Sequence, residues 1–220
     1  MLSLDILLDL KSELNYTMET IDSIQPKEGL TTPYSSSYIQ TPFNVWKWML
    51  IASLTCGVVG GVSLIYMEFV YFPANIGNID WQEYESFQIN AVLLFVIGGL
   101  ALITAFIMQL VLLYRNWKVI ANAEGLSADP GQAVGFMFIP LFNLYWQFIA
   151  HWKLSEGQEK FLQQAGISSS KVPNKGIAMA FCVCNCIPYV SVLSSFILGP
   201  IKEVNQKNIS LEIIKAVGAK

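Results

Sequence analysis

The chain has 220 residues, of which 54% are hydrophobic and only 13% are charged, about half the charged fraction of soluble globular domains. Its mean hydropathy of +0.48 comes from apolar runs of about 20 residues, the length that crosses about 30 Å of hydrocarbon. The net charge of −3 gives no overall attraction to nucleic acid. The sequence therefore predicts an all-α integral membrane protein and disfavours a soluble enzyme or a nucleic-acid-binding protein.

Residues 1–25 are predicted to form a cytoplasmic amphipathic helix. Apolar side chains recur there at helical spacing, with acidic residues between them. The ones that fit the a and d positions of a short heptad pattern are Leu4, Leu7, Leu14, Met18 and Ile21. Because acidic residues outnumber lysines in this segment, adsorption to an anionic leaflet is disfavoured. We expect this oligomerisation helix to pack on a partner copy or on the protein's own cytoplasmic face, and a linker at 26–44 to follow it.

Four apolar segments are predicted to cross the membrane, at 45–72, 91–114, 133–152 and 176–201. The third contains Pro140 and several polar residues, so a re-entrant or interfacial segment is the alternative there. Pro140 and Pro188 are expected to kink the third and fourth helices and to assist gating. Residues 202–220 are expected to form a cytoplasmic tail.

The distribution of lysine and arginine orients the first two spans. With four spans and a cytoplasmic N-terminus, nine of these residues lie inside and four outside, as the positive-inside rule requires. The first connecting loop, 73–90, has no basic residue. A re-entrant third segment gives the same count with the tail outside, so the rule leaves the third segment open.

A polar stripe runs along the predicted third span and continues past it, through Asn143, Gln147, His151 and Ser155. This spacing of four places the side chains on one helix face, which must contact protein or water rather than lipid. In the functional interpretation the stripe lines an aqueous path that is gated by protonation of His151. In the alternative, these side chains hydrogen-bond to neighbouring helices. Gln109 and Asn185 are further candidates for either role.

Acidic side chains gather near the first outer loop, at Glu68, Asp80, Glu83 and Glu85. If several copies surround an axis, these carboxylates would form an acidic vestibule that concentrates cations. The alternative is an ordinary solvated loop.

Cys182, Cys184 and Cys186 form a CxCxC run. On a helix Cys184 points nearly opposite to the other two, so the three thiols cannot converge on a metal unless the helix unwinds. We expect them to pack as small apolar side chains. We predict no metal and no cofactor, and no enzymatic activity, because no phosphate-binding, hydrolase or dinucleotide motif is found.

The second half of the chain contains an RN pair after the second span and then P..AVGF.FIP..NL. The residues of this pattern are Arg115, Asn116, Pro130, Ala133, Val134, Gly135, Phe136, Phe138, Ile139, Pro140, Asn143 and Leu144. The pattern resembles a segment of small bacterial multi-span membrane proteins of unknown function. The resemblance implies a multi-pass protein of the bacterial inner membrane, and it supplies no ligand or reaction. The distribution of lysine and arginine, independently of this resemblance, predicts a cytoplasmic N-terminus.

The leading functional hypothesis is a homo-oligomer that forms or gates an ion-conducting pore, for example a membrane-depolarising effector of a bacterial toxin or anti-phage (antiviral) defence system. The alternative is a non-conducting membrane scaffold or sensor that recruits a partner through its cytoplasmic N-terminal helix. The expected partners are the lipid bilayer, further copies of the chain and a cytoplasmic regulatory ligand or protein. An intramembrane enzyme ranks last, since candidate catalytic residues are lacking.

Overall fold

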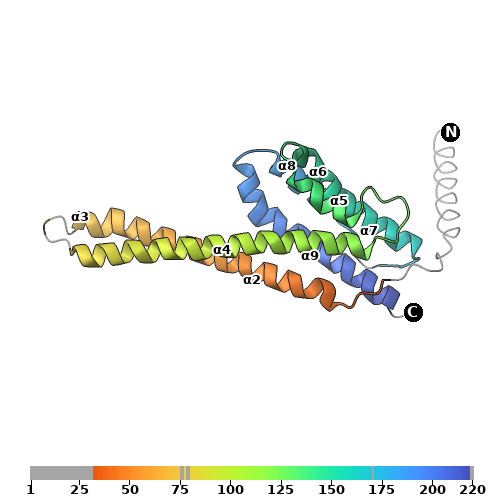
Figure 1. Ribbon diagram of the computed structural model, residues 1–220, viewed down its shortest axis with the longest axis horizontal. Helices are drawn as coiled ribbons and strands as arrows, with labels where there is room; N and C mark the ends of the chain where they lie inside the picture. The colour runs from red at the N-terminus through yellow and green to blue at the C-terminus, as the bar shows by residue number, and fades with distance from the viewer. Residues whose placement is uncertain (1–31, 75–76, 78–79, 170, 219–220) are drawn as a thin grey trace, which may run out of the picture. The chain divides into compact units, whose positions relative to one another are not determined.

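The computed structural model describes residues 32–74, 77, 80–169 and 171–218. All elements in these ranges are helical, with no strand among them, so the all-α class is confirmed (Figure 1). The chain divides into two compact units, 37–112 and a second unit that contains 113–220. The predicted oligomerisation helix at 1–25, with Leu4, Leu7, Leu14, Met18 and Ile21, lies outside the described residues.

The unit at 37–112 contains the two stretches that are long and apolar enough to cross a membrane. The first, Ser37–Ala74, consists of α2 (Ser37–Tyr66), a π-helical turn (Met67–Tyr71) and α3 (Phe72–Ala74). The second lies in α4 (Trp81–Val119). Within their most apolar windows only 6% and 22% of the residues are buried. Such exposure is typical of helices that face lipid and unlike the core helix of a soluble protein.

Close approach of α2 and α4 depends on two glycines. A Cβ at Gly98 would lie 3.1 Å from Cys56 Cβ, and one at Gly60 would lie 3.3 Å from the Phe95 ring. Glycine lets helix backbones approach closely, which is how helices gain packing energy where the hydrophobic effect is absent. A small core of Phe43, Trp46, Ala105 and Leu112 forms a second contact region of this unit.

The other unit is built from shorter helices. They are α5 (Pro130–Gly135), a 3₁₀ turn (Phe136–Phe138), α6 (Phe142–Gln147), a π-helical turn (Phe148–Trp152), α7 (Lys153–Gln164), α8 (Lys175–Asn185) and α9 (Val190–Gly218). The chain reverses direction between the 3₁₀ turn and α6, so that Trp146 Nε1 donates back to the carbonyls of Gln132 (3.1 Å) and Ala133 (3.2 Å) on α5. It reverses again between α8 and α9, which pack together.

The predicted third and fourth spans therefore differ from the structure. Neither 133–152 nor 176–201 is one continuous helix, and the described residues contain two candidate spans rather than four. Pro140 and Pro188 lie in turns between helices, not at kinks within one. A proline disfavours helical geometry in the residue before it. Each proline is followed by a residue with positive φ, Leu141 at 64° and Tyr189 at 68°, a backbone geometry that is uncommon outside glycine and occurs here where the chain turns back.

Replacing Gly98 by leucine tests the packing of α2 on α4. Leucine at this position must displace Cys56 or separate the helices, and overpacking costs about 1–3 kcal/mol. The neighbouring Gly99 has no atom within 4 Å of an added Cβ, so Gly99→Leu is the matched control. Thermal unfolding in detergent should show a lower midpoint for Gly98→Leu and a nearly unchanged one for Gly99→Leu. Equal midpoints for the two variants would contradict this packing.

Candidate functional site

A buried polar ladder joins α9 to the π-helical turn Phe148–Trp152 and α7, which follow each other without a break. We use this name for His151, Ser155 and Gln158 on one side and Lys202, Gln206 and Ser210 on the other. All six are at most 3% exposed. The pairs run in the same direction along both helices, from His151 with Lys202 to Gln158 with Ser210, so the two helices lie parallel. Burial of so many polar side chains is costly unless they are bonded to one another.

The charged end of the ladder is formed by His151, Lys202 and Glu203. Lys202 Nζ lies 2.9 Å from His151 Nδ1 and 3.0 Å from Glu203 Oε1. The ammonium also lies 4.1 Å from the centroid of the Phe181 ring, which itself contacts the imidazole edge to face. One buried cation is therefore held by a carboxylate, an imidazole and an aromatic face.

The other contacts of the ladder are hydrogen bonds between amide, carbonyl and hydroxyl groups. Gln206 Nε2 donates to the carbonyl oxygen of His151 (3.1 Å) and contacts Ser155 Oγ (3.5 Å). Gln158 Nε2 donates to the carbonyl oxygen of Gln206 (3.0 Å) and to Ser210 Oγ (2.9 Å). Ser210 Oγ donates in turn to Asn116 Oδ1 at 2.7 Å, which connects the ladder to the last turns of α4.

The ladder retains unused acceptors. The amide oxygens of Gln158 and Gln206 are buried and have no hydrogen-bond donor within the described part of the chain. Each amide oxygen has two lone pairs, so both can accept from an additional donor such as water. The ladder thus combines a titratable ring, a fixed cation and spare acceptors.

The position of His151 fixes its charge state. It lies outside the two candidate spans, in the π-helical turn Phe148–Trp152, a kind of turn that is frequent at functional sites. Burial, reinforced by the Lys202 ammonium, holds the pKa of His151 well below its ordinary value of 6.5. The ring is therefore neutral at neutral pH, and Nδ1 can accept a hydrogen bond from Lys202.

The other predicted polar residues lie at several places. Gln147 Nε2 contacts Cys186 Sγ, directly after α8, at 3.2 Å. Asn185 Oδ1 accepts from Ser194 Oγ at 2.7 Å, between α8 and α9. Asn143 is half-buried in the first turn of α6, and its amide oxygen has no hydrogen bond among the described residues. Gln109 is half-buried on α4, in the other unit, so the structure does not bring these residues together as one site.

The predicted acidic residues lie near the ends of the two candidate spans. Asp80 caps α4, since its Oδ1 accepts from the backbone amides of Gln82 (3.0 Å) and Glu83 (3.3 Å). The Glu83 carboxylate accepts from the Tyr71 hydroxyl at 3.0 Å. Glu68 and Glu85 are exposed. The cap and the tyrosine bond are structural contacts, and the acidic vestibule, which requires several copies, stays a prediction.

The thiols pack against backbone and amide groups. Cys182 Sγ contacts the Gln147 carbonyl oxygen (3.3 Å), and Cys186 Sγ lies 3.4 Å from the carbonyl oxygen of Cys182. Burial raises the pKa of the Cys182 thiol to about 11, which keeps it protonated and a poor metal ligand. Among the described residues no group of three or more histidine, cysteine or acidic side chains is placed to hold a metal ion.

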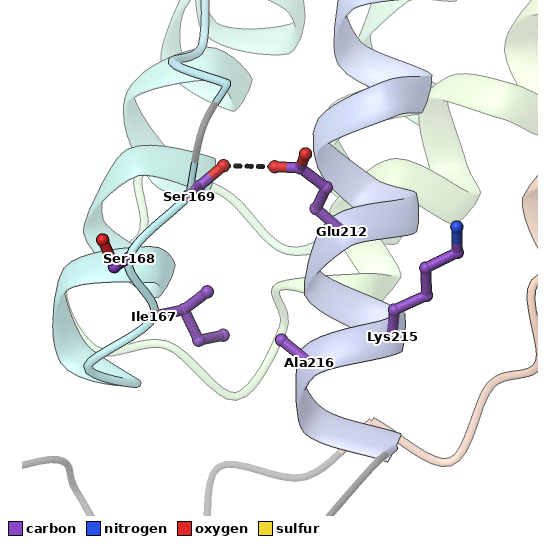
Figure 2. A pocket seen from close by; sticks show the side chains of 6 residues that line it. All are labelled: Ile167, Ser168, Ser169, Glu212, Lys215 and Ala216. Carbon is purple, nitrogen blue, oxygen red and sulfur yellow. Dashed lines mark hydrogen bonds between the residues drawn. The ribbon is translucent and has the colours of Figure 1, made fainter.

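A surface pocket near the C-terminal end of α9 is a weaker candidate site. Its volume is about 380 Å³, and it is lined by Ile167, Ser168, Ser169, Glu212, Lys215 and Ala216. Figure 2 shows Ser169 and Glu212 facing each other, joined by a hydrogen bond, while Lys215 points away from them. Glu212 also forms an ion pair with Lys171 at 3.9 Å. The carboxylate is thus already engaged by the protein.

Sequence reasoning missed the α9 half of the ladder. Lys202, Glu203 and Gln206 were assigned to a cytoplasmic tail because they follow the apolar run 176–201. A signal was present, since Lys202, Gln206 and Ser210 recur every four residues and so form a second polar stripe on one helix face. Two such stripes in one chain indicate that the helices can pair with each other.

Replacing Ser210 by alanine tests the ladder. The change removes the hydroxyl between Gln158 and Asn116 and leaves the buried Asn116 Oδ1 without that donor, a loss of about 1–3 kcal/mol. Ser195→Ala on the same helix is the control, because Ser195 is exposed and bonds only its own helix, at the Ser191 carbonyl. The unfolding midpoint in detergent should fall for Ser210→Ala and stay near wild type for Ser195→Ala. A wild-type midpoint for both would show that the ladder does not stabilise this unit.

Comparison with known proteins finds no match. No protein-family model, no curated protein and no solved structure matches this chain. The resemblance carried by Arg115, Asn116 and the AVGF.FIP segment therefore stays a prediction, and the function is argued from the site itself.

Proposed function

We propose that this chain is a membrane-anchored, non-conducting sensor in which proton binding at His151 loosens α7 from α9. The observation that supports the proposal is the position of Lys202 Nζ, 2.9 Å from His151 Nδ1 and 3.0 Å from Glu203 Oε1, with all three side chains at most 3% exposed. Buried ionisable groups in membrane proteins usually serve function, because burying them is costly.

Protonation of His151 changes the balance of charge in the ladder. With a neutral ring, one ammonium faces one carboxylate and donates to an imidazole nitrogen. With a protonated ring, Nδ1 becomes a donor, so the bond to Lys202 is lost and two cations face each other across 2.9 Å. Repulsion between like charges is strong where water is excluded. Separating α7 from α9 relieves the repulsion by admitting water.

Other charged and titratable groups lie on each of the helices that pack around the His151 imidazole. They are Lys202 and Glu203 on α9, Cys182 and Cys186 on α8, and Lys153 and Glu156 at the start of α7. The Glu156 carboxylate is paired with Lys153 at 2.7 Å and Lys160 at 3.2 Å, and these pairs hold its pKa below the ordinary value. The pKa of the Cys182 thiol is raised. Neither group therefore changes charge between pH 7.5 and 5.5.

The contacts of the polar stripe favour a sensor over a pore. Gln147, His151 and Ser155 are buried at 6%, 3% and 0% exposure and contact α8 and α9 of the same chain. A side chain that lines an open aqueous path contacts water instead. In this proposal the protein lies in the bacterial inner membrane, and the cytoplasmic N-terminal segment at 1–25 recruits the partner when the ladder opens.

Acid should destabilise the helical unit through His151. Because the pKa of His151 is depressed in the folded chain, the imidazole is neutral in both the folded and the unfolded chain above about pH 6.5. Below it only the unfolded chain binds the proton, so stability falls by up to about 1.4 kcal/mol per pH unit. The thermal midpoint in detergent should drop between pH 7.5 and 5.5 in wild type. In His151→Gln, whose amide oxygen can still accept from Lys202, the drop should be much smaller.

Because the chain has a single histidine, His151→Gln removes all histidine titration from the pH response. Glu159→Gln, which breaks the exposed ion pair with Lys175 (2.6 Å), is the control and should keep the wild-type pH response. An equal drop in His151→Gln would contradict the proposal.

A homo-oligomeric pore is the second candidate function. It is favoured by the exposure of long apolar faces on α2 and α4, which copies of the chain can cover. Ion flux through proteoliposomes at pH 7.5 and 5.5 separates the two functions. The sensor predicts no flux at either pH, whereas flux that Gln147→Leu abolishes would favour the pore.

A further inference from the structure

We propose that 130–152 and 175–201 are two matched helical hairpins that insert their turns into one leaflet of the bilayer without crossing it. We call them the first and second hairpin. The proposal concerns how the chain binds lipid, and it stands independently of the sensor function.

The two turns have the same construction. In the first, the backbone amides of Phe142 and Asn143 donate to the carbonyls of Pro140 (2.7 Å) and Ile139 (3.0 Å). In the second, the amides of Val190 and Ser191 donate to the carbonyls of Pro188 (2.9 Å) and Ile187 (3.0 Å). An Ile-Pro pair and a residue with positive φ occur at the same places in both. The same structural unit thus occurs twice.

Both turns expose large apolar side chains. Leu141 and Tyr189, the residues with positive φ, are 84% and 90% exposed. The exposed apolar residues around them are Phe138, Ile139, Leu144 and Tyr145 in the first hairpin and Ile187, Val192, Leu193 and Ile197 in the second. Exposed apolar surface of this extent marks a site that contacts lipid or protein.

The turns lie side by side at one end of this unit. Cys186, at the end of α8, contacts Gln147 Nε2 at 3.2 Å and the Leu144 carbonyl oxygen at 3.9 Å, so the two turns point the same way. Helix α8 packs against the π-helical turn Phe148–Trp152 of the first hairpin, and Figure 1 draws the helices of both hairpins in one cluster.

Charged residues are confined to the opposite end. No Asp, Glu, Lys or Arg occurs between Asp129 and Lys153, or between Lys175 and Lys202. Lys175 pairs with Glu159 at 2.6 Å where the second hairpin begins, and the Asn174 amide donates to Asn205 there at 2.9 Å. The pair of hairpins thus has an uncharged end with exposed apolar side chains and a charged end.

The length of the helices fits one leaflet. Helix α8 has 11 residues and so rises about 16 Å. The return path of the first hairpin, α6 with 6 residues and its π-helical turn with 5, is of similar length. Both reach about half of the roughly 30 Å hydrocarbon thickness.

Lipid is the occupant that fits these features. The same chain carries two candidate spans, so the hairpins are held at a bilayer. A re-entrant segment must bond its own backbone within the protein, and the turn hydrogen bonds described above do so. Tyr145 and Tyr189 add the amphipathic rings that suit the interface.

Topology provides the first half of the test. A protease site is inserted after Ser127, before the first hairpin, and separately after Ser168, between the hairpins, in the full-length protein in sealed vesicles. Both positions should be cut from the same side. Cutting from opposite sides would mean that the first hairpin crosses the membrane, which would overturn the proposal.

Insertion depth provides the second half. Single cysteines are placed at Leu141 and Tyr189 in a background without the native cysteines, with Gln163→Cys, at an exposed position of α7, as the control. A fluorophore attached at either turn should be quenched by lipids that carry a quencher in the acyl chain. In a separate measurement, a water-soluble maleimide should label the cysteine at either turn at least tenfold more slowly than it labels Gln163→Cys. Labelling of either turn as fast as Gln163→Cys would overturn the proposal. Slow labelling without quenching by the lipids would also overturn it, and would indicate that a protein partner covers the turn.

Discussion

The fold of the helical unit depends on keeping one buried ammonium satisfied. Lys202 lies at the point where the uncharged part of α9 meets its charged part, and its side chain is 1% exposed. An isolated charge there would be very costly. The protein surrounds it with Glu203 from the same helix, His151 from the π-helical turn and Phe181 from α8. Three helical segments therefore meet at this point.

The paired hairpins explain why these segments meet. The turns at Pro140 and Pro188 have the same hydrogen bonds, and the helices that follow them lie parallel, as the ladder pairs show. Parallel helices bring stripes of equal spacing into register, which is how His151 meets Lys202 and Gln158 meets Ser210. The ladder joins these two parallel helices. In the proposed topology it lies at the base of the hairpins, where an imidazole can exchange protons with the aqueous phase.

The sequence predicted the first two apolar helices well, because apolar length is a strong signal and depends little on tertiary contacts. The polar stripe through Gln147 and His151 was also identified, and the structure places both in contacts with neighbouring helices. The turns were the main difference. A proline in an apolar run is compatible with a kinked span and with a turn between two helices. The positive φ of Leu141 and Tyr189 cannot be predicted from the sequence, because leucine and tyrosine rarely adopt positive φ. Lys202 falls in the predicted cytoplasmic tail because it follows the apolar run 176–201, and His151, which it contacts, lies 51 positions earlier in the chain.

Nuclear magnetic resonance of the imidazole nitrogens of His151 tests the central claim most directly, because the chain has a single histidine. The ¹⁵N shifts of the full-length protein in lipid or detergent report the protonation and the tautomer of the ring as pH is varied. The account predicts a neutral ring at pH 6.5 with the proton on Nε2, leaving Nδ1 to accept from Lys202, and a titration midpoint well below the ordinary value. A midpoint at or above about 6.5, or a proton on Nδ1 in the neutral ring, would contradict it.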